Sequence, residues 1–563
     1  MQKIIKVYWP TGIAIVIFIA VFIINYNNID CIAVLNDEFG YWGNAATLTG
    51  MDWSSLLSQT PFYSMGYSLV LIPLFKLGIP MSAMYRIAIF MNMLFLFISY
   101  LCANYIAGSL YPDIDQKLCQ LISFVVASSG VMLFYSQIAW CETFLSMLMW
   151  ALVALFVRLE RKWSYAVPPV IVSVAFMIYL THQRAVLLLP VAVILLLAIC
   201  IEKKKFASAG CVLIMSVLSI VLYRHLHNWQ IKVVYGASEM SNMNSVTVTT
   251  SFVGDYLGKM FQNIGSIFIS IICKLGVIML STYYAFPIAC KKYIDRLIRK
   301  DHTYWGTWTL ILAASILMLA LTSTQMYGTS RKDLVVYSRY MDFVIPPIAM
   351  ISMCELLNNF HQNRNIYIVS VSATVPILLI SMNVIEHSDM YFNVLCSPLW
   401  GSLIEYYNNT FMAGIIIIEV SLLILVSFIL ANKLSSRKAV YLFTIFLTIP
   451  CFFSFAYSNG HTNKIRRGNY SHISGIYDVI KEHSDNAVFY SLPDFEDEIT
   501  ADIYIKYLQT LLYNRPLENL NGIDTIKEES LIIEKKTIHD KELMKSCELL
   551  EDKGEYLLYM YYD

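Results

Sequence analysis

The sequence predicts an all-α membrane protein that crosses the bilayer many times and ends in a small soluble α/β domain. Hydrophobic residues make up 57% of the 563-residue chain and charged residues only 14%, whereas soluble domains average about 45–50% and 25%. The mean hydropathy is +0.58. The composition changes after residue 457, where charged clusters such as DFEDE at 494–498 appear. We therefore expect a transmembrane domain at 1–457 and a soluble domain at 458–563.

Apolar runs of spanning length, about 20 residues, recur about thirteen times along the chain. The expected transmembrane helices cover residues 9–27, 83–108, 118–136, 142–159, 164–182, 185–201, 206–223, 265–289, 305–323, 341–359, 365–385, 412–431 and 438–457. The apolar run at 62–79 is a further candidate, but Gly66, Pro73 and Lys76 interrupt it.

The positions of lysine and arginine decide whether this run crosses the membrane. If it does not cross, Lys3 and Lys6 place the N-terminus in the cytoplasm, and the strongly basic short loops return there, as the positive-inside rule requires. These loops lie at 158–162, 202–205, 291–300, 363–365 and 433–438. We therefore expect 62–79 to lie along the outer membrane surface or to re-enter it. The long segments at 28–82 and 225–264 and the C-terminal domain are then on the outer side.

The C-terminal domain shows both strand and helix patterns. Residues 487–492, 530–536 and 555–562 are rich in β-branched and aromatic side chains, which predicts strands. The apolar residues in 473–483, 498–512 and 540–550 have helical spacing. We therefore expect a small α/β domain outside the membrane.

Charge and cysteine content exclude two classes of protein. The formal net charge is zero, so the overall balance indicates no nucleic-acid partner. The 12 cysteines are scattered, mostly in apolar runs, and form no disulfide or zinc pattern. His182, His225 and His227 lack neighbouring ligands at metal-binding spacing, and we interpret them as interface histidines.

Chemistry-bearing residues gather in the first outer segment. Asp37 and Glu38 follow the first expected span, aromatic residues come directly after them, and the uncrossed apolar segment is next. An acid pair held at the bilayer in this way suits a reaction between a lipid substrate and a second substrate that arrives from water. Arg86, Arg184 and Arg339 fall at expected outer ends of spans, where a planar guanidinium can bind phosphate with two hydrogen bonds.

The first 200 residues resemble those of the GT-C glycosyltransferases, polytopic enzymes that use lipid-phosphate sugars. The family includes protein O-mannosyltransferases and the lipid A aminoarabinose transferase. The resemblance rests on Asp37-Glu38 and Tyr41, and on a set of short segments in the same order along the chain. These are TGMDW (49–53), PFYSMGYSLVLIPLF (61–75), MYRIAIFMN (84–92), SQIAWCETF (136–144) and LTHQRAVLLLP (180–190).

The resemblance implies roles for individual residues. Asp37 matches the catalytic base, with Glu38 second, and Glu142 is another acid, from the second outer loop. The expected ligands of the donor phosphate are Arg86, Arg184, Arg339 and Tyr340. Further substrate-loop candidates are Tyr41, Asp52, Trp53, Tyr63, Arg331 and Lys332. No motif specifies a cofactor, and a divalent metal ion shared by the acids stays open.

The expected function is that of an inverting transferase in the plasma membrane, in a bacterial cell. Its partners would be a polyprenyl-phosphate sugar, a glycan, lipid or protein acceptor with a hydroxyl group, and the lipid bilayer. Two alternatives stay open: a polymerase of polyprenyl-linked polysaccharide, and a flippase or transporter. Transporters place ionisable residues near the bilayer midplane, whereas here these residues gather at the outer ends of the expected spans. The sequence indicates neither the sugar nor the acceptor.

Overall fold

A computed structural model describes residues 2–29, 31–33, 35–236, 263–325, 332–387, 397–434, 437–491, 503–520, 526, 529–536, 547–553 and 555–562. The first half of the chain forms α1 (Gln2–Asn25), η1 (Tyr26–Asn28), α2 (Leu35–Leu48), α3 (Ser54–Leu57), α4 (Gly66–Phe75), α5 (Met81–Leu110), α6 (Gln116–Ala127), α7 (Gly130–Tyr135), α8 (Glu142–Arg161), α9 (Val167–Thr181), η2 (Gln183–Leu187), α10 (Leu188–Glu202), α11 (Phe206–Trp229) and η3 (Gln230–Val234). The helices of the second half are α14 (Ile264–Ser281), α15 (Phe286–Ile298), α16 (Trp305–Gln325), η4 (Lys332–Val335), α17 (Ile345–Asn358), α18 (Arg364–Glu386), α19 (Pro398–Tyr407), α20 (Thr410–Leu434), α21 (Arg437–Phe446), α22 (Thr448–Glu482) and α23 (Ile503–Leu511).

The protein is a multi-pass membrane protein. Ten helical segments in the described part of the chain are long and apolar enough to cross a bilayer. Three further expected spans coincide with shorter apolar helices, at 116–127, 167–181 and 345–358. The expected span at 118–136 is divided, because α6 ends at Ala127 and α7 begins at Gly130. Gly130 lies against the backbone of Cys451, where a Cβ atom would come within 2.3 Å of the carbonyl oxygen.

The apolar run at 62–79 contains helix α4. Its ten residues rise about 15 Å, half the thickness of the hydrocarbon core. Gly66 at its start contacts the backbone of Thr181 at the end of α9, and a Cβ atom there would lie 2.6 Å from the Thr181 nitrogen. This close approach fixes α4 against α9, and whether the segment crosses the bilayer stays a prediction.

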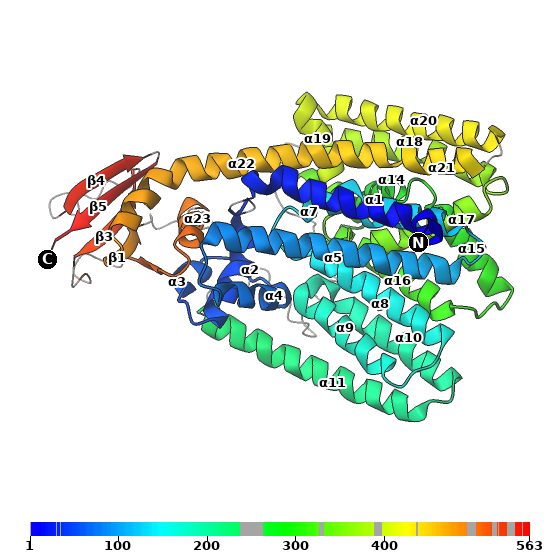
Figure 1. The fold of residues 1–563 in the computed structure, drawn as a ribbon, viewed down its shortest axis with the longest axis horizontal. Coiled ribbons are helices and arrows are strands. Elements are labelled where there is room, and N and C mark those ends of the chain that lie inside the picture. Colours follow the sequence, from blue (N-terminus) through cyan, green and yellow to red (C-terminus); the bar gives the residue numbers. More distant parts are fainter. Residues whose placement is uncertain are drawn as a thin grey trace.

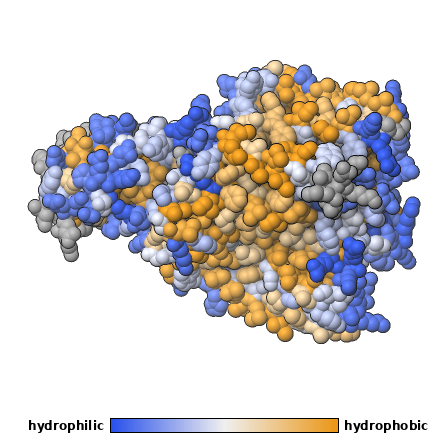
Figure 2. All heavy atoms as spheres, viewed as in Figure 1, coloured by the Kyte–Doolittle hydropathy of each residue, from blue (hydrophilic) through white to orange (hydrophobic). Residues whose placement is uncertain are grey.

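The molecule is a helical bundle with a sheet at one end (Figure 1). Helices α2, α3 and α4 lie at the end of the bundle nearest the sheet, and α15 lies at the opposite end (Figure 1). Figure 2 shows that hydrophobic side chains cover the middle of the bundle, while hydrophilic residues gather at the sheet and at the far end. This distribution is that of a protein embedded in a bilayer.

The C-terminal part contains five strands, β1 (Ala487–Ser491), β2 (Leu517–Asn519), β3 (Ser530–Lys535), β4 (Cys547–Lys553) and β5 (Tyr556–Tyr561). Their order is β2-β1-β3-β5-β4. Strand β1 is parallel to β2 and β3, whereas β5 is antiparallel to β3 and β4. Helix α22 carries the chain from the bundle to this sheet (Figure 1). The expected domain boundary at 457/458 falls inside α22 and stays a prediction.

The structure confirms the three strands expected from the sequence but contradicts the helix expected at 540–550. Residues 547–550 begin β4; residues 540–546 lie outside the described residues. Two residues separate β4 from β5, the length of a tight hairpin turn. Pairing along β5 overrides the local helical spacing, because it satisfies the backbone hydrogen bonds of β4.

The C-terminal part contacts the segment between α1 and α5 directly. Trp53 donates a hydrogen bond from Nε1 to the Tyr513 carbonyl oxygen at 3.0 Å. The hydroxyl groups of Ser55 and Tyr490 are 2.9 Å apart. The buried Lys506 on α23 donates to Asn36 Oδ1 on α2 at 3.1 Å. The sheet and α23 thus hold the helix that carries the acid pair.

Candidate functional site

The candidate site begins on α2, which presents Asp37 and Glu38 in its first turn. Acidic residues are favoured there by the helix dipole. Gly40, three residues after Asp37, lies under the Tyr63 ring, where a Cβ atom would come within 2.1 Å of the ring. This space allows the Tyr63 hydroxyl to donate to Asp37 Oδ1 at 2.6 Å. The glycine in the sequence therefore positions a tyrosine on the acid.

Arg339 joins two acids from distant parts of the chain. Its Nη1 donates to Asp37 Oδ2, and its Nε donates to Glu142 Oε1. The guanidinium carbon also lies 4.0 Å from the centre of the Trp140 ring. Glu142 is the first residue of α8, so the expected second acid does approach the first. Burial strengthens these ion pairs, because the local dielectric is low.

Asp37 is the accessible acid of the pair. Its side chain is 22% exposed, whereas that of Glu142 is 5% exposed. Burial opposes ionisation of Asp37, but the charge of Arg339 and the hydrogen bonds from Tyr63 and Arg339 outweigh it and lower the pKa below 3.8. The carboxylate is therefore ionised at neutral pH and accessible to a substrate.

Arg184 approaches the same cluster from η2. Its guanidinium carbon is 3.5 Å from the centre of the Tyr340 ring, and Arg339 is 6.0 Å from that centre. His182 contacts the same ring edge-on at 5.4 Å. Among the described residues, no atom accepts a hydrogen bond from the buried Nη1 of Arg184. A buried donor of this kind favours binding of an anion.

Glu38 faces the opposite side of α2 and belongs to a sealed network. It is fully buried and accepts hydrogen bonds from Ala33 N at 2.6 Å, Tyr85 Oη at 2.5 Å and Ala139 N at 2.9 Å. Arg466 on α22 donates to the same Tyr85 hydroxyl at 3.0 Å. Several hydrogen bonds hold this carboxylate away from water. The structure therefore separates the two adjacent acids.

Several other expected site residues lie away from the Asp37–Arg339–Glu142 cluster. Asp52 is exposed and accepts from the backbone nitrogen of Ser54 at 3.0 Å. Trp53 stacks on Phe39 with ring centres 5.5 Å apart. The guanidinium carbon of Arg86 lies 4.5 Å from the centre of the Tyr26 ring.

Tyr41, by contrast, lies beside the cluster. Its hydroxyl donates to Cys141 Sγ at 2.9 Å, and Cys141 precedes Glu142. Burial raises the pKa of Tyr41 well above its usual value, so the hydroxyl stays protonated and remains a donor. Arg331 lies outside the described residues, and Lys332 begins η4.

Three residues at or near these acids and Arg184 were not expected from the sequence. Trp140 lies under Arg339, and Arg466 supports the Glu38 network. Lys274 is buried in α14, donates from Nζ to the Thr322 carbonyl oxygen at 2.7 Å, and is close enough to Arg184 to interact electrostatically. A lysine inside an apolar span is costly, and that signal was available in the sequence.

The described residues do not support a metal centre. No group of three or more His, Cys, Asp and Glu side chains gathers among them in a metal-binding arrangement. Asp37 and Glu142, the acids that could share an ion, both contact Arg339. A cation would have to displace this guanidinium, so the arrangement does not fit a metal ion.

Comparison with known proteins identifies the fold. No protein-family model matches the chain, and no curated protein matches its sequence. Crystal structures of ArnT from Cupriavidus metallidurans match nearly the whole chain at 11% identity. The form bound to undecaprenyl phosphate covers 97% of both chains with a TM-score of 0.56, and the apo form covers 98% of both with 0.52. The chain therefore has the GT-C fold that its first 200 residues resemble.

Proposed function

We propose that the protein is a membrane glycosyltransferase that transfers a sugar from a polyprenyl phosphate to an acceptor hydroxyl at the outer face of the membrane. The observation that carries this proposal is the cluster of Asp37, Glu142, Arg339 and Arg184, with one accessible carboxylate beside an arginine that has a buried donor. The ArnT structure bound to undecaprenyl phosphate supports a polyprenyl-phosphate carrier for a chain of this fold.

Asp37 is the proposed general base. Its carboxylate takes the proton of the acceptor hydroxyl while the acceptor oxygen attacks the anomeric carbon. The bond between that carbon and the phosphate oxygen breaks, and the electron pair leaves with the polyprenyl phosphate. Attack opposite the leaving group inverts the anomeric carbon. The hydrogen bond from Tyr63 and the ion pair with Arg339 orient the carboxylate.

Arg184 is the proposed main ligand of the donor phosphate. Its buried Nη1 can donate to a phosphate oxygen, and the Tyr340 ring fixes the plane of the guanidinium. Lys274 lies close enough to Arg184 to interact with it electrostatically. Arg339 lies on the same aromatic ring, so its charge can also stabilise the leaving phosphate.

The proposal is tested with purified protein in lipid nanodiscs and a panel of radiolabelled polyprenyl-phosphate sugars, with extracted membrane lipids, glycans and peptides as acceptors. We expect transfer from at least one donor, with inversion, and loss of transfer in Asp37→Asn. Asp52→Asn is the matched control, because Asp52 is an exposed acid of the same outer segment. Absence of transfer from every donor, in a preparation that remains folded, would contradict the proposed activity.

A further inference from the structure

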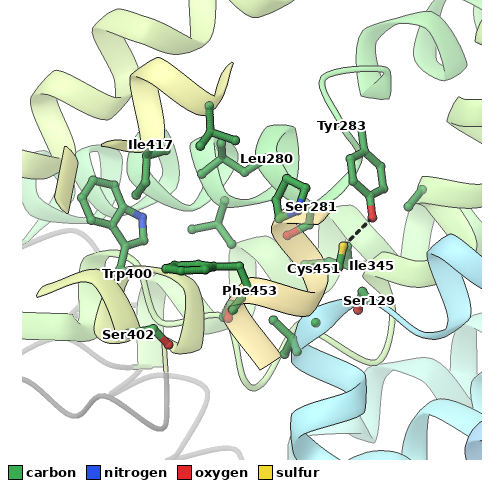
Figure 3. A pocket seen from close by; sticks show the side chains of 18 of the residues that line it. Ser129, Leu280, Ser281, Tyr283, Ile345, Trp400, Ser402, Ile417, Cys451 and Phe453 are labelled. Atoms are coloured by element: carbon green, nitrogen blue, oxygen red, sulfur yellow. Dashed lines mark hydrogen bonds between the residues drawn. The ribbon is translucent and has the colours of Figure 1, made fainter. Parts of the chain in front are cut away.

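A large apolar pocket lies within the bundle, between α7, α14, α17, α19, α20 and α22. Its volume is about 450 Å³, within the range of small-molecule sites. Figure 3 shows Trp400, Ile417 and Phe453 around it, contributed by α19, α20 and α22. Most of its lining is hydrocarbon, including Leu280 and Ile345. A pocket of this composition favours an aliphatic chain over a sugar.

Residues exposed on the membrane-facing surface also line this pocket. Leu423 on α20 is 58% exposed, and Ile449 and Phe453 on α22 are 59% and 55% exposed. Both helices belong to segments long and apolar enough to span a bilayer. The pocket is therefore accessible from the hydrocarbon of the membrane, and a lipid can enter it sideways with its chain already in apolar surroundings.

The polar groups at one wall come from the segment that carries Arg339. Ser338 and Asp342 line the pocket, and the Ser338 hydroxyl donates to Asp342 Oδ2 at 3.1 Å. Among the described residues that line the pocket there is one carboxyl group, Asp342, several hydroxyl groups and no lysine or arginine. This wall suits an uncharged head group with hydroxyls and repels a phosphate.

Two aromatic residues connect this wall to the candidate site. The Tyr135 hydroxyl donates to Asp342 Oδ2 at 2.7 Å, and its ring meets the Trp140 ring edge-on at 5.2 Å. Arg339, which binds Asp37, also contacts the Trp140 ring. A head group at the Asp342 wall would thus lie next to the residues that hold the base.

We propose that this pocket binds the hydrocarbon chain of the acceptor, so that the acceptor is a membrane lipid whose head group carries a hydroxyl and no phosphate at the pocket wall. The inference rests on the proposed function and adds the class of acceptor. The donor is assigned elsewhere because its phosphate needs the cations near Tyr340, and the described lining of the pocket supplies none.

Binding is measured with three photoreactive probes that do not require sugar transfer. The first is a diacylglycerol with a diazirine in one acyl chain, the second is phosphatidic acid with the same chains, and the third is a diazirine-labelled polyprenyl phosphate. Labelled peptides are identified in the full-length protein in nanodiscs. We expect the diacylglycerol to label α20 and α22 about tenfold more than phosphatidic acid does, because phosphatidic acid carries a charged phosphate in place of the free hydroxyl.

Variants at two neighbouring positions test where the lipid enters the pocket. Leu423→Trp narrows the pocket and is expected to reduce diacylglycerol labelling about tenfold, because the indole ring fills space that the chain needs. Leu422→Trp is the matched control: Leu422 is 48% exposed on the same helix and is not among the lining residues. Equal labelling in both variants, or preferential labelling of these peptides by the polyprenyl phosphate, would overturn the proposal.

The same measurement in Asp37→Asn separates this inference from the proposed activity. Labelling should persist in that variant, because the substitution does not touch the pocket. Labelling without any transfer in the wild type would reject the proposed activity and leave a lipid-binding site. Transfer to a soluble acceptor as efficient as transfer to the lipid would reject the lipid acceptor and keep the transferase.

Discussion

Asp37 and Glu38 are neighbours in the sequence, yet Asp37 forms an ion pair with Arg339, whereas Glu38 is linked to Arg466 through the Tyr85 hydroxyl. Asp37 binds Arg339, from the segment before α17, and remains 22% exposed. Glu38 lies in the network of Tyr85 and Arg466, from α22, and is fully buried. Adjacent acids on a helix can therefore have different roles, because successive side chains point in different directions. Under the proposed function, Asp37 faces the substrate and Glu38 holds the helix.

Among the variants that test stability, the substitution of Arg466 should lower the unfolding midpoint most. Replacing it with Met keeps much of the volume but removes the charge, so the buried Glu38 network loses its cation. Breaking a buried pair in this way costs about 3–5 kcal/mol. The apparent unfolding midpoint in urea should fall strongly, and the control Arg467→Met, at an exposed neighbour, should not change it. An unchanged midpoint in Arg466→Met would show that Glu38 is not anchored as described.

A smaller effect is expected on donor use at Arg184. Arg184→Ala removes a charge-assisted hydrogen bond worth about 1.5–3 kcal/mol, so kcat/KM for the donor should fall roughly 10- to 150-fold. Arg86 contacts Tyr26, and Arg86→Ala should reduce kcat/KM by less than about fivefold. If Arg86→Ala reduced kcat/KM more than Arg184→Ala did, the donor phosphate would lie at Arg86.

The pH dependence of kcat/KM tests the proposed role of Asp37. The pKa of Asp37 lies below 3.8 because Arg339 outweighs burial, so kcat/KM should show no acid limb from Asp37 between about pH 5 and 8. The lowered pKa also stabilises the fold above about pH 3.9, and this contribution is lost as the pH falls through the folded pKa. Arg339→Gln removes the cation while burial remains. The pKa of Asp37 should therefore rise, and the acid limb of kcat/KM should move to higher pH. An unshifted limb would show that another group is the base.

The smallest effect is expected at Asp52, whose exposed carboxylate accepts a hydrogen bond from the Ser54 nitrogen at the start of α3. Asp52→Ala removes this hydrogen bond and should cost about 0.5–1.5 kcal/mol of stability, and it should change kcat by less than about threefold. Thermal unfolding and steady-state kinetics measure both. A loss of kcat near that of Asp37→Asn would return Asp52 to the candidate site.

Much of the site was predictable because its signals are local. Asp37 follows the first span, and Arg339 lies in a cluster of charges at the outer end of a span, against the positive-inside bias. The approach of Glu142 to Asp37 was inferred from the resemblance, and the structure brings both to one guanidinium.

The rest depends on contacts that no local pattern contains. Glu38 and Arg466 are far apart in the chain and are brought to the same Tyr85 hydroxyl only by the tertiary fold, so nothing near Glu38 in the sequence distinguishes it from Asp37. The helix expected at 540–550 fails for a similar reason, because β5 determines the conformation of 547–550. Burial determines the environment of Glu38, and long-range strand pairing determines the conformation of 547–550. Both are tertiary properties.

A paired measurement tests whether Asp37 is the general base and Glu38 is a structural residue. Single-turnover sugar transfer and urea unfolding are recorded for Asp37→Asn and Glu38→Gln in parallel. The account predicts that Asp37→Asn cuts turnover about 10²- to 10⁴-fold with donor binding retained, whereas Glu38→Gln mainly lowers the unfolding midpoint and its folded fraction retains transfer. Normal turnover in Asp37→Asn together with an inactive but stable Glu38→Gln would contradict the account and assign the base to Glu38.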